Sequence, residues 1–433
     1  MIVKTETQPY IDAFRSGPRA GEPEPIAAQR EAALARFGAL GFPTRRQEAW
    51  RFTNLRALER RSFPPSVGGA APASAVEALR LAGPAHRLVL VNGRFAPELS
   101  DTSALPRGAW IKSTAQTLAE RPSLPVLDAG DSEGAQPFAA LNAAFFTDGV
   151  VIALEPGVAL ERPVEIIHLG RAEAPASLHL RSRIELAPGS RARVIESFAG
   201  AGPYWTNAVL GIELGAGAAL DHVALQDESG EAIHLALARL RLDAGARYDG
   251  FSLTLGGALS RRDVQVELAG EGARLGLNGA YLLRGEQEAT IATVVDHAAP
   301  GCTTRELFKG VVGDRAHGVF QGSIAVRPQA QKTDAHQLNK NLLLSRRATV
   351  DTKPALEILA DDVKCSHGAT VGDLDESALF YLRARGIGEG EARRMLIEAF
   401  AADALDTVEG EAFRPRLAAH LQAWLGLRES WES

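Results

Sequence analysis

The chain has 433 residues, enough for about three domains of typical size, and its 45% of hydrophobic residues suits a globular protein with a substantial core. The formal net charge of −6 and the lack of a long basic run argue against nucleic acid or an anionic membrane as a partner. Two cysteines cannot build a disulfide framework or a site of four thiolates within one chain, which indicates a reducing cytosol.

The start of the chain shows no targeting or membrane signal. Residues 1–8 lack the apolar core of a signal peptide. No apolar stretch approaches the roughly 18 residues that a membrane span requires. We therefore expect a cytoplasmic protein that does not enter a membrane.

Residues 1–85 predict a polar, helical N-terminal domain. Apolar residues recur at helical spacing over Ile26–Leu40. The next stretch, Pro43–Leu55, is rich in charge, and we expect it to begin another helix. Its two aromatic residues, Trp50 and Phe52, are interpreted as packing residues.

Residues 86–148 predict a small α/β lead-in segment. The stretch His86–Val91 has the pattern of a strand, and the pair Asn92-Gly93 that follows favours a turn. Pro137–Phe146 predicts a short helix.

From about residue 149 the pattern changes to short strands separated by glycine turns. The run Ile184–Ser190 is echoed by four later runs, which are Ile212–Ala218, Leu240–Ala246, Val266–Ala273 and Val295–Gly301. Successive turn glycines are 28, 28, 27 and 29 residues apart, at positions Gly189, Gly217, Gly245, Gly272 and Gly301. A regular repeat of this kind indicates stacked structural units.

The repeat predicts a mainly β fold with a parallel β-helix core over residues 149–373. A propeller blade needs about 40–45 residues, which is longer than this unit. A β-sandwich would not make the turns so regular. One coil cannot bury its apolar face alone, whereas stacked coils share a continuous core and pair each strand with its neighbours.

Residues 374–433 return to helical patterns and predict a C-terminal helical domain. We expect Asp375 to cap a first helix that ends at Gly386. Further apolar stripes cover Glu391–Phe400 and Phe413–Leu425. These helices could form a cap that closes the end of the β-helix, and their outer face could also dock a partner protein.

The strongest candidate site is Lys364–Gly368. If Val363–His367 is extended, Cys365 and His367 point to one face with Cα atoms about 6.5–7 Å apart, so both could reach one metal ion or small cluster. The same residues could instead be a small buried hydrophobe and a hydrogen-bonded turn residue. Upstream, Ala348–Ile358 predicts a strand, a turn and a second strand.

Other chemical signals are weaker. Asp334 and His336 could bind a metal ion or form a hydrogen-bonded turn, and the turn is favoured. His222 and His234 are expected to be structural or surface residues, and Cys302 to be buried or incidental. The chain has no P-loop, no Gly-x-Ser-x-Gly elbow and no His-Glu-x-x-His motif.

Several of these stretches resemble the SufB/SufD family of the SUF iron–sulfur cluster assembly system. The string Asp-Val-Lys-Cys-Ser-His-Gly-Ala-Thr is closer to the SufD branch than to the SufB branch, and Pro43–Leu55 is similar to the N-terminal helical segment of the SufD branch. The resemblance covers nearly the whole chain, and its most specific parts are Phe308–Gly310, Gln331–Leu344, Asp351–Pro354 and Asp362–Gly372.

The resemblance implies a right-handed parallel β-helix flanked by helical N- and C-terminal domains. It also implies a non-catalytic scaffold subunit that pairs with SufB through the β-helices and binds the ATPase SufC through residues 374–433. A transient iron–sulfur cluster or iron would be shared at the SufB–SufD interface, and reduced flavin would associate with the complex. By this resemblance, His367 and its companion Cys365 are candidate cluster ligands.

Elementary chemistry agrees on one point. Two cysteines cannot hold a conventional cluster alone, so the ligands should face a partner. An imidazole in place of a thiolate makes a cluster less reducing and more labile, which suits a site that gives its cluster away. Without SufB, the exposed β-helix edge is expected to pair two copies in a homodimer.

Two alternatives stay open. The first is a β-helical polysaccharide-active enzyme of pectin lyase-like type. The absence of a secretion signal and the aromatic content of 6% argue against this alternative. The second is a purely structural subunit in which Cys365 and His367 serve only packing.

Overall fold

The computed structural model describes residues 5–17, 22–121, 136–408 and 413–426. Residues 1–4, which contribute to the expected absence of a signal peptide, lie outside the described residues, as do the last seven positions of the expected C-terminal domain, 427–433. Within the described ranges, no helix is long and apolar enough to cross a membrane.

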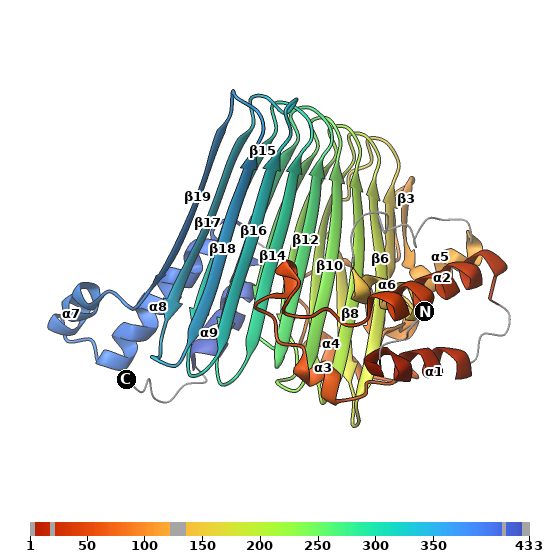
Figure 1. The fold of residues 1–433 in the computed structure, drawn as a ribbon, viewed down its shortest axis with the longest axis horizontal. Helices are drawn as coiled ribbons and strands as arrows, with labels where there is room; N and C mark the ends of the chain where they lie inside the picture. Colours follow the sequence, from red (N-terminus) through yellow and green to blue (C-terminus); the bar gives the residue numbers. More distant parts are fainter. Residues whose placement is uncertain (1–4, 18–21, 122–135, 409–412, 427–433) are drawn as a thin grey trace.

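The centre of the protein is a parallel β-helix built from two facing sheets (Figure 1). Sheet A contains β3 (Ala109–Ser113), β4 (Val150–Leu154), β6 (Ala176–Leu186), β8 (Tyr204–Leu214), β10 (Ile233–Leu242), β12 (Leu259–Leu268), β14 (Glu288–His297), β16 (His317–Val326) and β18 (Thr349–Ile358). Sheet B contains β2 (Arg94–Phe95), β1 (His86–Val91), β5 (Val164–Arg171), β7 (Arg191–Ala201), β9 (Ala219–Asp227), β11 (Arg247–Thr254), β13 (Arg274–Leu283), β15 (Thr303–Val312), β17 (Asp334–Leu343) and β19 (Lys364–Gly372). The predicted parallel β-helix is confirmed.

Each coil contributes one strand to each sheet, and equivalent residues of successive coils stack. Apolar side chains at paired positions in sheet A form a ladder through the core, made of Ile184, Ile212, Leu240, Val266, Val295 and Ile324. All of these residues except Ile324 belong to the runs that revealed the repeat in the sequence. The sequence period is therefore the length of one coil.

The predicted glycines lie in the turns that lead from sheet A to sheet B. All five have positive φ, a conformation that side chains with a Cβ rarely adopt. At Gly217, for example, φ is 66° and the amide donates to the carbonyl of Ala244 in the next coil, at 2.8 Å. The turns thus stack on one another as the strands do.

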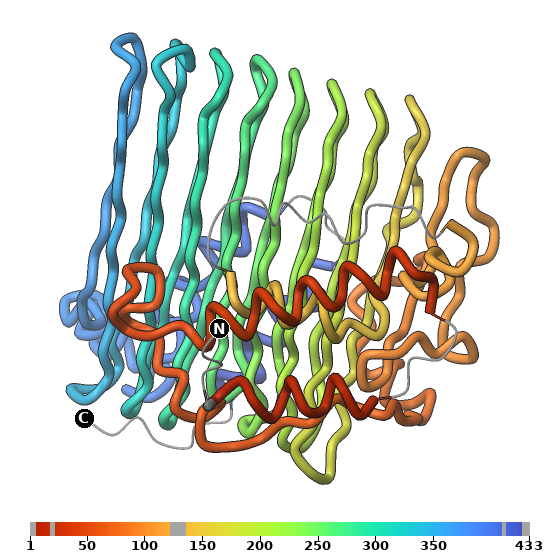
Figure 2. Tube along the Cα trace, turned by 45° about the vertical axis from the view of Figure 1, so that its right-hand side comes forward, coloured from red at the N-terminus to blue at the C-terminus, as the bar shows by residue number. Residues whose placement is uncertain are grey.

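The N-terminal region covers the outer face of sheet A (Figure 2). Its aromatic residues, among them Tyr10, Phe37 and Trp50, pack against Trp205 of β8 and Leu235 of β10. Its short elements and helices are η1 (Thr5–Thr7), α1 (Gln8–Ser16), α2 (Glu24–Leu40), η2 (Glu48–Trp50), α3 (Arg56–Arg60), α4 (Ala73–Glu77), η3 (Pro97–Leu99), α5 (Thr114–Glu120) and α6 (Pro137–Phe145). The predicted helix over Pro137–Phe146 is confirmed.

The C-terminal helices do not close the end of the β-helix, so the predicted cap is wrong. Helices α8 (Glu389–Leu405) and α9 (Arg414–Gly426) pack on the outer face of sheet B, behind the strands in Figure 1. Helix α7 (Glu376–Ala384) lies beyond the last coil, with Asp375 as its N-cap as predicted. The last coil, β18 and β19, is therefore left open.

The expected helix start at Pro43–Leu55 is also wrong. The segment contains the short turn η2 instead, because its side chains pack against sheet A, where Oγ1 of Thr53 lies 3.1 Å from Oγ1 of Thr290 in β14. Trp50 is buried as predicted, with the guanidinium of Arg261 4.0 Å from its ring centre, whereas Phe52 is half-buried. Tertiary contacts have overridden the local helical pattern.

The expected turn within Ala348–Ile358 is absent, because β18 runs through it as one strand. Pro354 lacks an N–H donor, which would interrupt a strand paired on both sides. Among the described strands, β18 pairs with β16 and no other, so its free edge tolerates the proline.

Candidate functional site

Cys365 and His367 lie on β19, the edge strand of the last coil. The segment is extended as predicted, so both side chains point to the same face. Cys365 is paired in register with Ala335 of β17, and His367 with Gln337. Since Ala335 is buried in the core, the shared face is the interior of the β-helix at its open end.

The thiol of Cys365 is half-buried against the core. Burial raises its pKa above the ordinary value, and the carboxylate of Asp334 acts in the same direction. Without another ligand or cation, the side chain is therefore a neutral thiol rather than a thiolate. A metal ion bound there would have to displace the proton.

His367 is exposed, and no described residue forms a hydrogen bond or ion pair with it. Its ring nitrogens are therefore available. Across the described ranges, no three His, Cys, Asp or Glu side chains are gathered where they could hold a metal ion. Cys365 and His367 provide two donors at most, so a complete site requires ligands from outside the described residues.

Apolar side chains surround this open end. Leu359, Val371 and Ile358 are exposed by 59%, 45% and 40%. The outer edges of β18 and β19 pair with no other strand of the described chain. An exposed apolar patch beside two free strand edges is typical of a surface that pairs with another protein.

The other predicted residues lie elsewhere. Asp334 and His336 form a surface ion pair, Oδ1 to Nε2 at 2.9 Å, on the outer face of β17 rather than in a turn. His222 and His234 are buried inside the β-helix, as structural residues would be, and Cys302 is buried in the core. Asp334 and His336 lie on the strand next to Cys365 and His367, and Nδ1 of His336 lies 2.5 Å from Oγ of Ser366, but their side chains face outward.

Sequence reasoning missed a buried acid–base cluster in the early coils. Glu196 lies 2.9 Å from Nε2 of His168 and 3.5 Å from Nε2 of His222. Burial alone would raise the pKa of Glu196, but its hydrogen bonds and attraction to the two histidines outweigh burial and hold the pKa well below its ordinary value. These residues are about one coil length apart in the sequence, which is the signal that could have revealed the cluster.

A second missed group lies nearer the open end. Glu306 is buried and accepts a hydrogen bond from the amide of Gln337. Burial raises the pKa of Glu306 to about 7, against the opposing effect of Gln337 and Thr293. A carboxyl group with this pKa changes its charge near neutral pH.

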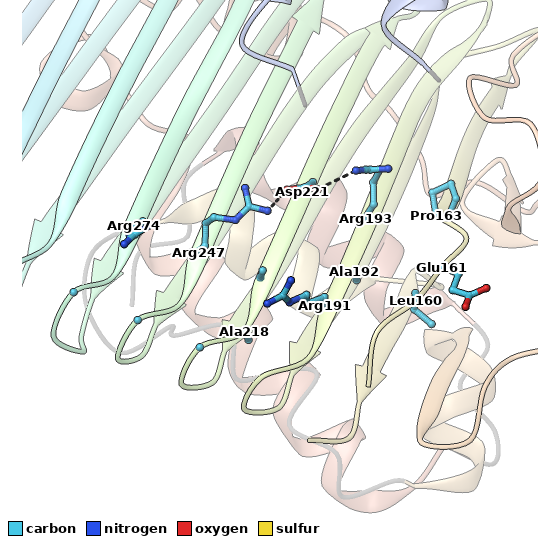
Figure 3. Close-up of a pocket in the computed structure, with 14 residues that line it drawn as sticks. Leu160, Glu161, Pro163, Arg191, Ala192, Arg193, Ala218, Asp221, Arg247 and Arg274 are labelled. Atoms are coloured by element: carbon cyan, nitrogen blue, oxygen red, sulfur yellow. Dashed lines mark hydrogen bonds and ion pairs between the residues drawn. The ribbon is translucent and has the colours of Figure 1, made fainter. Parts of the chain in front are cut away.

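An open groove of about 690 Å³ runs along the glycine turns, beside the first residues of the sheet B strands (Figure 3). Asp221 lies between Arg193 and Arg247, at 3.3 and 2.8 Å, as the dashed lines in Figure 3 show. Arg191 and Arg274 complete its basic lining. The groove belongs to the coils from β5 to β13 and does not include the last coil.

The C-terminal helices are fixed to the β-helix by a buried lysine. Lys309 of β15 donates to Asp403 at 2.5 Å and to the carbonyl of Phe400 at 2.8 Å, and its ammonium lies 4.5 Å from the Phe400 ring centre. Helix α7, beyond the last coil, has two exposed aromatic side chains, Phe380 and Tyr381, which are 74% and 56% exposed. The helices therefore combine a fixed inner face with an exposed aromatic surface.

The fold defines a parallel β-helical protein whose last coil ends in free strand edges. Family comparison gives this class a specific identity. Residues 168–400 match the SufBD core domain of SUF system FeS cluster assembly, and residues 4–166 match the SufBD protein N-terminal region. The chain belongs to the SufBD family.

Individual relatives agree along most of their length. The iron-sulfur cluster assembly protein SufD of Escherichia coli is 35% identical over 386 residues, which are 88% of this chain and 89% of the relative. An iron-sulfur cluster assembly SufBD family protein of Synechocystis is 32% identical over 90% of this chain and 89% of its own length. Protein ABCI7 of Arabidopsis chloroplasts is 29% identical over 93% and 86%. The family does not support the polysaccharide-enzyme alternative.

Proposed function

We propose that this chain is a SufD-type scaffold subunit that helps to form or hold a nascent iron–sulfur cluster at an interface with a SufB-type partner. The observation that carries the proposal is the position of His367, exposed and unpartnered within the described chain, on the open last coil. The similarity to a SufD protein over most of both chains supports it.

The donor set suits a shared and temporary cluster. Iron–sulfur clusters accept thiolate and imidazole ligands, and this chain offers one of each at the open end. His367 is the stronger ligand because its nitrogens are accessible without displacing a buried proton. Cys365 is second, because its raised pKa must first be overcome.

Two surfaces fit the partners of such a scaffold. The edges of β18 and β19, with exposed Leu359 and Val371, would pair with a SufB-type β-helix or, in its absence, with a second copy of this chain. The exposed aromatics of α7, Phe380 and Tyr381, would contact the ATPase SufC. Turnover of ATP would then belong to SufC, with this chain non-catalytic and cytoplasmic. Reduced flavin would associate with the assembled complex.

The test is His367→Ala, with His336→Ala as a matched control. His336 is also an exposed histidine near the last coil, but it faces outward and is paired with Asp334. The complex of this chain with its SufB-type and SufC-type partners is supplied with ferrous iron and sulfide without oxygen, and cluster absorption is followed. We expect His367→Ala to lose most of the cluster and His336→Ala to retain it.

Undiminished cluster formation in His367→Ala would contradict the role of this histidine. A Cys365/His367 double substitution that assembles clusters normally would support the purely structural alternative. If the wild-type chain copurified with neither partner, the assignment as a scaffold subunit would fail.

A further inference from the structure

A column of polar side chains leads inward from His367. His367 is paired in register with Gln337, and Gln337 is paired with Glu306 of the preceding coil. Phe308, two residues after Glu306, packs in the core, so Glu306 faces the interior as well. Paired positions in neighbouring coils are about 4.8 Å apart, which places the carboxyl group two coils beneath the open end.

The two buried members of this column are in contact. Nε2 of Gln337 donates to Oε2 of Glu306, whereas Oε1 of each side chain is buried and has no hydrogen-bond partner among the described residues. The amide of Gln337 lies against Gly322 of sheet A, where any Cβ would overlap it. Gly322 therefore leaves room for Gln337 to lie across the core.

No described residue forms an ion pair with Glu306. Leu277 precedes it in the column, and Thr293 acts on its pKa from sheet A but forms no hydrogen bond of normal geometry. The neighbouring cations in its own strand, Arg305 and Lys309, pair with Asp334 and Asp403 on the outer face. Within the described part of the chain, Gln337 is the one hydrogen-bond partner of the Glu306 carboxylate, and the raised pKa of about 7 allows both protonation states near neutrality.

We propose that Glu306 is a positioning residue for His367 that acts through the amide of Gln337. The inference rests on the proposed function of His367 and adds a proton-dependent control to it. When Glu306 is ionised, it accepts from Nε2 of Gln337, as seen here, and the carbonyl Oε1 can accept the N–H of the imidazole. The other ring nitrogen of His367 then keeps its lone pair for iron.

Protonation of Glu306 reverses the direction of the hydrogen bonds that Gln337 makes. The carboxyl group takes one proton from solvent and donates it in a hydrogen bond to Oε1 of Gln337. The amide N–H groups are then directed to the last coil, where they compete for the lone pair of the imidazole. A fall in pH through the pKa of Glu306 would therefore weaken the hold of His367 on the cluster.

The first experiment needs no cluster. ¹⁵N histidine spectra of the wild-type chain are recorded across neutral pH, with His367 assigned by its loss in His367→Asn. We expect the chemical shifts of the His367 ring nitrogens to respond to the titration of Glu306, and this response should disappear in Glu306→Gln and in Gln337→Leu. Profiles that are identical in all three folded chains would overturn the proposal.

The second experiment follows cluster retention in the complex loaded with ferrous iron and sulfide. Glu306→Gln should lower the affinity for the cluster about tenfold at about pH 8, the size expected for a residue behind a metal ligand. In the Gln337→Leu background, the same change should have no further effect, whereas additive losses would overturn the proposed route. If His367→Ala retained the cluster, the proposed function would fail while the spectra of the apo chain still tested this inference.

Discussion

Glu306 makes the stability of the protein depend on pH in a direction that the structure fixes. The pKa of this carboxyl group rises from 4.5 to about 7 on folding because the group is buried. The folded state therefore binds more protons than the unfolded state between these values, and stability falls as pH rises through this window. This rise in the pKa corresponds to about 3 kcal/mol of folding free energy, which is lost in full above the folded pKa.

The assay is urea unfolding of the wild-type chain and of Glu306→Gln at about pH 5 and about pH 8.5. Glutamine stays neutral at both pH values. The free energy of unfolding of the variant, relative to that of wild type, should therefore be about 3 kcal/mol higher at the upper pH than at the lower. Glu196→Gln is the matched control, since Glu196 is equally buried but its pKa is lowered by His168 and His222. It should be destabilised at both pH values. If the free energies of unfolding of Glu306→Gln and wild type differed by the same amount at both pH values, the reasoning would be refuted.

Two further predictions concern the core and the open end. Gly310→Ala should destabilise the chain by about 1–3 kcal/mol in urea unfolding, because the new Cβ would overlap the ring of Tyr281. The control Gly211→Ala has nothing within 4 Å of its new Cβ and should leave the stability unchanged. Equal effects of the two substitutions would contradict this prediction. Replacing the exposed Leu359 and Val371 together by lysine should abolish pairing of the last coil in sedimentation experiments while leaving monomer unfolding unchanged, and an undiminished dimer would place the interface elsewhere.

The fold could be predicted because glycines and apolar residues recur in the sequence at the spacing of one coil. A turn that needs positive φ recurs in five successive coils, and glycines such as Gly217 and Gly245 mark it directly in the sequence. The position of the C-terminal helices could not be predicted in the same way. An apolar stripe such as that of α9 shows that one helix face is buried, but it does not show which surface covers it.

The sequence could likewise reveal only some residues of the candidate site. Cys365 and His367 could be found because their spacing in an extended strand places them on one face. Glu306 was missed because strand alternation alone does not tell an inward polar residue from an outward one. Its sequence neighbours Arg305 and Lys309 are both charged and both outward, so the segment resembles a solvated strand until its register is known.

The two ends of the β-helix differ in a way that favours the last coil as the place of the proposed shared site. At the N-terminal end, β3 and the β1–β2 hairpin continue the sheets beyond the first coil, with antiparallel pairing that ends the repeat. At the other end, β18 and β19 present free edges and exposed apolar side chains. Long free edges invite pairing, so this end is where another chain can bring ligands of its own. A cluster held there by residues of two chains can be released when they separate, which a site sealed inside one chain would not allow.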